Sequence, residues 1–280
     1  MKGEAAACIH ILAAIIMLTQ EQTQKYLERI GLLEPKEPSR EYLDELIWAH
    51  QLSVPFENLD MIDFAKPTIV TVEHLYDKVV ERRRGGYCFE LNGIFCELLV
   101  SLGFDSVGCI ARVRSFDPNA VRRLHRVSVV TLDGEQLFAD VGFGGAMPPV
   151  SVPMDGSVRS TFKGDYCFAV EEDGEMSLMQ VMPEGELKPL VAFYNKETPD
   201  VEFVIANHWT GSSPDSPFRM NRSLNFNKPD GFVSLSGTTL NITKGDEKTT
   251  REITTLREYY EVLEEYFGLS FSMSEVRGDL

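Results

Sequence analysis

The stretch Arg84-Gly85-Gly86-Tyr87-Cys88-Phe89-Glu90-Leu91-Asn92 joins a pair of glycines to a cysteine and to the start of an apolar stripe. Because glycine has no Cβ atom, the pair lets the backbone pass close to another segment. Apolar side chains then recur at helical spacing until Gly103, which predicts a buried helix that begins near Cys88. Unpaired N–H groups and the positive end of the helix dipole would face the sulfur, a setting that makes a thiol nucleophilic. A buried structural cysteine is an equally good interpretation of this stretch alone.

The composition indicates an acidic globular protein. Of its 280 residues, 43% are hydrophobic and 25% are charged, which allows about one to three domains. A net charge of −16 and a pI near 4.8 argue against nucleic acid or an anionic membrane as partner. The five cysteines include no CxxC pair, so we expect neither a disulfide framework nor a metal site, and the cytoplasm is the expected compartment.

The N-terminal segment is apolar but too short to span a bilayer as a helix. We expect residues 1–16 to be an extension outside the fold, with Met17 as the functional start. The alternatives are an additional helix packed on the body and a signal peptide, although no convincing cleavage site follows the apolar segment.

The pattern of the chain changes twice. Residues 17–105 carry helical periodicity, with Thr19 and Ser39 as candidate helix caps. Residues 106–210 show alternation and turn signals, which predict an antiparallel sheet or a small barrel. Residues 211–280 mix short strands with an amphipathic helix that ends at Gly268.

One hairpin can be predicted with its register. Asp133-Gly134 separates two strand-like segments and is a typical two-residue turn. If these two residues form the turn, the numbers of opposed residues sum to 267, as 133 and 134 do. His125 and Asp140 then lie on one face as diagonal neighbours, roughly 7–8 Å apart at Cα. A shift of the register by one residue would place them on opposite faces.

This hairpin supplies the partners that a nucleophilic cysteine needs. A thiol is activated by a histidine base, which an acid orients, so Cys88, His125 and Asp140 are candidate catalytic residues. Taken singly, the histidine is more often structural and the acid more often belongs to a strand end, but the joint arrangement favours catalysis. The glycine-rich segment 142–145 permits close approach to a ligand and is equally typical of a tight turn.

These pieces together resemble the arylamine N-acetyltransferase family. The matching segments are Val54-Pro55-Phe56-Glu57-Asn58-Leu59, the stretch 84–92, His125, and Asp140-Val141-Gly142-Phe143-Gly144. Their order and separations are similar to those of the family, and the resemblance runs from about residue 17 to about residue 271. Residues 1–16 fall outside it.

The resemblance implies an α+β fold with a cysteine-protease-like arrangement of the triad. An N-terminal helical bundle (17–105) would carry Cys88, a central antiparallel β-barrel (106–210) would carry His125 and Asp140, and residues 211–280 would form an α/β lid. It also implies ping-pong transfer: acetyl-CoA, the co-substrate, acetylates the cysteine, and an aromatic amine or hydrazine then takes the acetyl group. No metal is implied, and the protein would be a monomer or a homodimer.

The resemblance further suggests supporting residues. Substrate and CoA would contact Phe56, Leu124, Phe143, Gly144 and Gly145. Structural support would come from the Arg84–Glu57 ion pair and from Asn92. For Phe56, Leu124 and Phe143, ordinary core packing is the alternative interpretation. Because CoA carries phosphates and this chain is acidic, we also expect a local basic patch, with candidates Arg112, Arg114, Arg122 and Arg123.

Three other functions fit the same residues. A thiol hydrolase shares the order Cys, His, Asp but lets water resolve the acyl-enzyme. An amide synthase would act on a longer acyl chain in a wider cleft. A non-catalytic CoA- or ligand-binding homologue is the third, and the presence of all three triad residues argues against it.

Overall fold

The computed structural model describes residues 17–145 and 147–271, so the expected N-terminal extension lies outside the described residues. In chain order the helical segments are α1 (Gln20–Arg29), α2 (Arg40–Ser53), α3 (Leu59–Ile62), α4 (Val72–Tyr76), a π-helical turn (Asp77–Glu81), α5 (Cys88–Ser101), α6 (Asp200–Ser212), a 3-10 turn (Pro217–Arg219) and α7 (Leu256–Phe267). The strands are β1 (Phe56–Glu57), β2 (Asp105–Val113), β3 (His125–Leu132), β4 (Glu135–Ala139), β5 (Val152–Pro153), β6 (Arg159–Thr161), β7 (Gly164–Val170), β8 (Met176–Val181), β9 (Leu187–Phe193), β10 (Ser223–Lys228), β11 (Gly231–Ser236), β12 (Thr239–Lys244) and β13 (Glu247–Glu252). Among the described residues, no helix is long and apolar enough to cross a bilayer.

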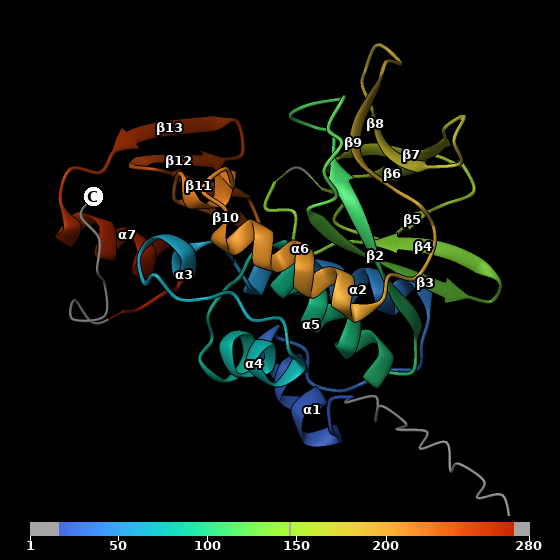
Figure 1. Cartoon of the computed structure of the whole chain (residues 1–280), viewed down its shortest axis with the longest axis horizontal. Coiled ribbons are helices and arrows are strands. Elements are labelled where there is room, and N and C mark those ends of the chain that lie inside the picture. The colour runs from blue at the N-terminus through green and yellow to red at the C-terminus, as the bar shows by residue number, and fades with distance from the viewer. Residues whose placement is uncertain (1–16, 146, 272–280) are drawn as a thin grey trace, which may run out of the picture.

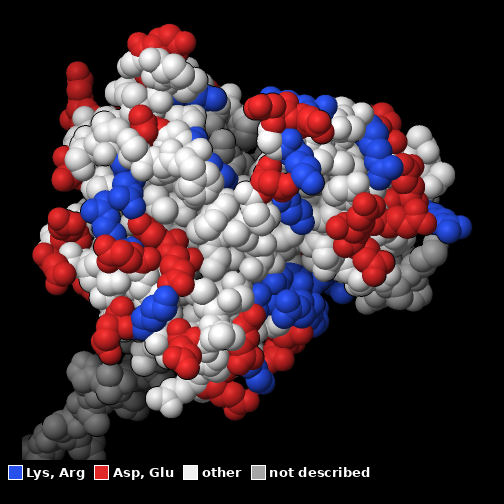
Figure 2. Space-filling model, turned by 180° about the vertical axis from the view of Figure 1, so that it is seen from behind, with Lys and Arg blue, Asp and Glu red and all other residues white. Residues whose placement is uncertain are grey.

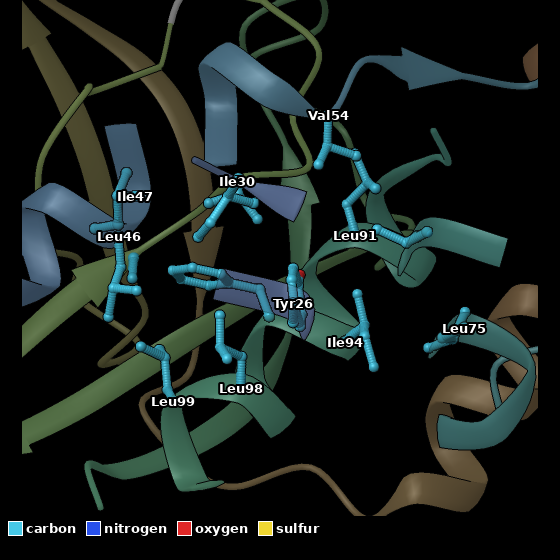
Figure 3. Packing of buried hydrophobic residues seen from close by; sticks show 14 of the residues in the cluster. Tyr26, Ile30, Leu46, Ile47, Val54, Leu75, Leu91, Ile94, Leu98 and Leu99 are labelled. Carbon is cyan, nitrogen blue, oxygen red and sulfur yellow. The ribbon is translucent and has the colours of Figure 1, made fainter. Parts of the chain in front are cut away.

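Helix α5 is the centre of the helical part. It is buried on nearly every side, which is the pattern expected of a helix surrounded by other elements. Figure 3 shows side chains of α5, among them Ile94 and Leu98, gathered around Tyr26 of α1, with Leu46 and Ile47 of α2 close by. The predicted helix that begins at the cysteine is therefore confirmed.

The helices that pack on α5 begin where the sequence indicates. The Thr19 hydroxyl accepts a hydrogen bond from the Gln22 amide and forms a capping box, and the Ser39 hydroxyl accepts from the Tyr42 amide. The two caps satisfy amide groups that the first turns of α1 and α2 leave unpaired, so both helices start at defined positions.

The central sheet is antiparallel and has the strand order β5-β4-β3-β2-β9-β8-β7-β6. It curls until β5 packs on β7, which gives a nearly closed barrel (Figure 1). The predicted hairpin is formed by β3 and β4, with Ser128 opposite Ala139, so the predicted register is confirmed. Asp133 and Gly134 have φ values of 51° and 85°, as a type I′ turn requires.

Strand β3 joins the barrel to the helices because both of its faces are buried. Val127 and Val129 point into the barrel core, whereas Val130 belongs to the core around α5. The side chain of His125 shares the face of Val127, and it stands at the end of the strand where barrel and helices meet.

The last part of the chain forms a second antiparallel sheet, in the order β1-β10-β11-β12-β13, covered by α7. Helix α7 ends at Gly268 with a φ of 66°, as predicted. Strand β1 was not expected: Phe56 pairs with Asn225, so the sheet reaches back to the loop before Cys88. The α+β class with helical bundle, barrel and α/β lid is confirmed.

Helix α6 is the second element that the sequence patterns missed. It spans the boundary that we placed at residue 210 between the predicted barrel and the predicted lid. Its apolar residues occur on opposite sides, since Phe203 is buried while Val204 and Ile205 are exposed. Val201, Val204 and Ile205 do recur at helical spacing, but this stripe is exposed and does not mark the face that packs on the core. The helix crosses the molecule between the two sheets (Figure 1).

Candidate active site

Cys88 is the first residue of α5 and is 2% exposed. The glycine pair sets its position, because a Cβ atom on Gly85 would lie 2.1 Å from the Pro55 carbonyl oxygen. Because Gly85 and Gly86 have no side chains, the loop can lie against β1. There the Glu57 amide donates a hydrogen bond to the Gly86 carbonyl oxygen at 2.9 Å. The Cys88 sulfur lies 3.6 Å from the Leu124 carbonyl oxygen, one residue before the predicted histidine.

His125 and Asp140 meet as the register predicted. Nε2 of the imidazole lies 2.6 Å from Oδ2 of the carboxylate, and both residues are buried. Nδ1 is then the nitrogen left for Cys88, whose interaction with His125 contributes to the raised pKa of the imidazole. Burial lowers the pKa of His125, but the charge and hydrogen bond of Asp140, with a smaller contribution from Cys88, outweigh it and raise the pKa to about 10.

The carboxylate of Asp140, which orients the histidine, is itself held by two hydrogen bonds. Oδ1 of Asp140 accepts hydrogen bonds from the Gly142 amide and from the Asn92 side chain, each at 2.8 Å. Asn92 lies one turn beyond Cys88 on α5, and its oxygen accepts from the Val141 amide at 2.8 Å. The predicted support by Asn92 therefore has a geometric basis: it ties the helix of the cysteine to the segment of the acid.

The structure adds a residue that no pattern in the sequence selects. The Gln51 side chain of α2 donates to the carbonyl oxygens of Asp140 and Pro148, both at 3.1 Å. Neither bond could be found by spacing, because the partners are separated by 89 and 97 residues.

A buried ionic cluster lies beneath the start of α5. Arg84 Nη2 lies 2.6 Å from Glu57 Oε1, so the predicted ion pair is present, and it also reaches Asp60 at 3.2 Å. Lys78 was not predicted, yet its ammonium lies 2.8 Å from Glu90 and 2.7 Å from Asp60. Burial lowers the pKa of Lys78, but the surrounding carboxylates outweigh it and raise the pKa. The signal that could have found Glu90 is its place three residues after Tyr87, whose amide donates to it at 3.1 Å.

Cys88 and His125 border a cavity of about 630 Å³. Of the residues predicted to contact substrates, the lining includes Phe56, Leu124, Phe143 and Gly144. Gly145 does not line it and faces a smaller pocket beside Gln51 and Phe226. Lining residues that were not predicted come from the loop 114–124, from α6 and from the segment before β10; they include Phe116, Trp209 and Phe218.

The expected basic patch is partly engaged in ion pairs. Arg112 and Arg123 form ion pairs with the buried Glu175, and Arg114 pairs with Glu171 and Glu175. These three arginines share two carboxylates, a pairing that spacing along the chain does not reveal. Of the four candidates, the cavity lining includes only Arg122.

A cysteine at a helix start, beside a histidine held by a buried acid, is the arrangement of thiol-dependent acyl-transfer enzymes. The model of the N-acetyltransferase family matches residues 40–276. Over 226 residues, 79% of each chain, the protein is 32% identical to an arylamine N-acetyltransferase of Escherichia coli.

Solved structures agree with this match. The arylamine N-acetyltransferase of Salmonella typhimurium superposes with a TM-score of 0.85 at 27% identity, covering 92% of this chain and 97% of that one. The Mycobacterium marinum arylamine N-acetyltransferase in complex with CoA gives a TM-score of 0.79 at 28% identity, covering 87% and 91%. The chain belongs to the arylamine N-acetyltransferase family, a family of acetyltransferases.

Proposed function

We propose that this protein transfers the acetyl group of acetyl-CoA to the nitrogen of aromatic amines or hydrazines through an acetyl-Cys88 intermediate. The observation that carries the proposal is the meeting of Cys88 with the His125–Asp140 pair on the wall of one aromatic cavity. The names of the relatives support the acceptor class, and the CoA complex of the Mycobacterium marinum relative supports the donor.

The first half-reaction acetylates the cysteine. Because the pKa of His125 is raised to about 10, the imidazolium persists at neutral pH and stabilises a thiolate on Cys88. The thiolate attacks the thioester carbonyl, so a new carbon–sulfur bond forms and the bond to CoA breaks. The proton of the imidazolium passes to the departing sulfur, and CoA leaves as a thiol.

The second half-reaction restores the starting state. The neutral amine nitrogen attacks the acetyl carbonyl, the bond to the Cys88 sulfur breaks, and the product amide leaves. His125, now neutral, takes the proton that the nitrogen loses, which regenerates the thiolate–imidazolium pair. Asp140 keeps the ring in one orientation and stabilises its charge in both steps.

The residues around the cysteine favour attack by an amine over attack by water. The state of the cysteines fits a reducing compartment. Phe56, Leu124 and Phe143 give the cavity an apolar wall that suits a flat ring. The four cysteines that the structure describes are free thiols, which fits the proposed cytoplasmic location.

The test is intact mass spectrometry of the protein mixed with acetyl-CoA in the absence of an amine. We expect one acetyl adduct on the wild type, none on Cys88→Ala, and loss of the adduct when 4-methylaniline is added. Cys96→Ala is the matched control, since this buried cysteine lies on the same helix and should leave the adduct unchanged. CoA release without an adduct would identify a hydrolase. If the experiment gave no adduct and no CoA release, the proposed catalysis would be excluded.

A further inference from the structure

The loop 114–124 forms part of the cavity wall, although little of it is buried. The ladder between β2 and β3 ends where Ala111 pairs with His125, so the loop beyond has no regular strand pairing. Phe116 and Val121 of this loop line the cavity and are 89% and 78% exposed. Apolar burial of this extent does not hold a loop in one place. Polar contacts must therefore set its position.

These contacts converge on Glu175, a fully buried acid in the turn between β7 and β8. Its Oε1 lies 2.6 Å from Arg123 Nη1, at the end of the loop. Its Oε2 lies 3.1 Å from Arg114 Nη2, at the start of the loop, and also pairs with Arg112 of β2. One carboxylate therefore connects both ends of the loop to the barrel.

Two of these arginines have no second acid. In the part of the chain that the structure describes, Glu175 is the only carboxylate within ion-pair distance of Arg112 or Arg123. The side chains of the two arginines are 16% and 26% exposed, so water can screen their charges only in part. Removing the charge of Glu175 would leave both guanidinium groups close together without a counter-charge. Their repulsion would push the end of the loop away from its start.

The acid and the loop are each braced by hydrogen bonds. The Glu175 amide donates to Asp173 Oδ1 at 3.0 Å, and the Glu175 carbonyl oxygen accepts from the Glu171 amide at 2.8 Å, which closes the turn. On the other side, Arg112 donates to the carbonyl oxygen of Ala120 at 3.3 Å, in the second half of the loop. A fixed turn thus presents the carboxylate, and one of its arginine partners extends the contact along the loop.

The end of the loop reaches the reacting centre. Arg123 is followed by Leu124, which lines the cavity and whose carbonyl oxygen lies 3.6 Å from the Cys88 sulfur. A shift of this end would change the space through which an amine approaches acetyl-Cys88. The catalytic groups have supports of their own, because Cys88 begins α5 and His125 is held by Asp140.

We infer that Glu175 is a positioning residue that holds the loop 114–124 as the wall of the cavity next to Cys88. It acts from outside the cavity lining, through Arg112 and Arg123. The inference rests on the proposed acetyl transfer for its kinetic consequence. It deepens that proposal by naming the residue that shapes the approach to the acetyl-cysteine.

The kinetic test separates the cavity wall from the catalytic groups. For the wild type and Glu175→Gln we would measure kcat/KM for 4-methylaniline with saturating acetyl-CoA, and the rate of Cys88 alkylation by iodoacetamide. We expect kcat/KM to fall about tenfold, because the acceptor loses a surface that orients it. Alkylation should change by less than about twofold, because the imidazolium of His125 keeps its contact with Asp140. An unchanged kcat/KM, or an equal fall in both rates, would overturn the inference.

Two further variants show whether the ion pair is responsible. Glu175→Asp keeps the charge on a shorter side chain and should keep part of the kcat/KM. Glu172→Gln, a change of an exposed acid in the same turn, removes the same charge and should keep all of it. Equal losses in Glu175→Gln and Glu172→Gln would assign the effect to net charge and would contradict the inference.

Arg123→Gln covers the case in which Glu175→Gln does not fold, because it leaves Glu175 paired with Arg112 and Arg114. It releases only the end of the loop beside Leu124, so kcat/KM should again fall while alkylation is kept. In the double variant the loss should be no larger than in Glu175→Gln, because both changes break the same contact. Losses that multiply, or an unchanged kcat/KM in Arg123→Gln, would overturn the route through Arg123.

A fluorescence measurement distinguishes failure of this inference from failure of the proposed function. The guanidinium of Arg122, in the same loop, lies 5.0 Å from the ring centroid of Trp209, and Trp48 is the other tryptophan of the chain. In a Trp48→Phe background, quenching of Trp209 by acrylamide therefore reports the position of the loop without turnover. We expect stronger quenching in Glu175→Gln than in Glu172→Gln, even if no acetyl group is transferred. Equal quenching would exclude the role of Glu175, whatever the mass spectra show.

Discussion

His125 carries the charge on which the proposed chemistry depends. In the folded state its pKa is about 10, against an ordinary value of 6.5. A group whose pKa rises on folding stabilises the native state fully below its unfolded pKa and loses this effect as the pH passes its folded pKa. The charged His125 therefore stabilises the fold below about pH 6.5, and that contribution disappears between about pH 6.5 and 10.

Replacing Asp140 should uncouple the cysteine from the histidine. Burial lowers the pKa of His125, and in Asp140→Asn no carboxylate outweighs this effect. The pKa of His125 therefore falls, and a thiolate on Cys88 loses its counter-charge near pH 7. We expect alkylation of Cys88 by iodoacetamide at about pH 7 to slow at least tenfold and to recover as the pH rises. Asp155→Asn, an exposed acid, is the control, and parallel pH profiles for Asp140→Asn and the wild type would contradict the assignment.

Gly142 makes a second residue-level prediction. A Cβ atom there would lie 2.9 Å from Asn92 Nδ2 and 3.0 Å from the Cα of Cys88, both within the catalytic centre. We expect Gly142→Ala to lower kcat/KM about a hundredfold by displacing the cysteine, while the circular dichroism spectrum stays unchanged. Gly145→Ala should be tolerated, because its Cβ would meet only the Phe143 ring at 3.4 Å. Equal activities of the two variants would show that the contact has no role.

At the scale of elements, the start of α5 depends on a buried charge pair. Lys78 and Glu90 are each 1% exposed, and burial raises the pKa of Glu90, while the charge of Lys78 opposes this shift. Removing one partner leaves a buried charge, so we expect Lys78→Met to lower the free energy of unfolding in urea by about 3–5 kcal/mol. Lys25→Met removes an exposed ion pair and should cost less than about 1 kcal/mol.

A second substitution distinguishes the charge from the packing. Glu90→Gln keeps an oxygen for the Tyr87 amide but removes the negative charge. Added to Lys78→Met, it should restore about 1 kcal/mol or more, since the uncompensated charge is gone. A double variant that is less stable than Lys78→Met would mean that packing around the lysine stem accounts for the loss.

The elements that the sequence predicted are those with local determinants. The Asp133-Gly134 turn fixes the register of β3 and β4, so the contact of His125 with Asp140 follows from residues within one hairpin. The caps at Thr19 and Ser39 likewise act within a single turn. Where the determinant is distant, prediction failed: β1 exists because Phe56 meets Asn225, and α6 packs through Phe203 while exposing Val204.

The same distinction applies to the candidate site. Cys88, His125 and Asp140 follow from motif and register, but Lys78 and Gln51 act through partners that only the tertiary fold supplies. The arginines near the barrel rim were expected to offset the acidic surface for the phosphates of CoA. In the structure Arg112 and Arg123 both pair with the buried Glu175, a partner that no pattern in the sequence indicates.

The whole molecule carries a negative charge, and so does acetyl-CoA, the proposed co-substrate. The net charge of the protein is −16. Figure 2 shows acidic side chains over both lobes of one face, with basic side chains among them and an uncharged area between. At low ionic strength, charges of equal sign repel over tens of ångströms, so the overall field slows the approach of acetyl-CoA.

Screening should therefore speed the first half-reaction. Between about 10 and 150 mM salt the Debye length falls from about 30 to about 8 Å. We expect the second-order rate constant for the reaction of the protein with acetyl-CoA, followed by CoA release, to rise several-fold. With the uncharged ester 4-nitrophenyl acetate as the acetyl donor, the rate constant should show no such rise. Stopped-flow detection of the released thiol or nitrophenol measures both. A rate that falls with salt for acetyl-CoA alone would mean that a local positive region outweighs the net charge. If this salt dependence disappeared in Arg122→Gln, that region would include Arg122, which lines the cavity.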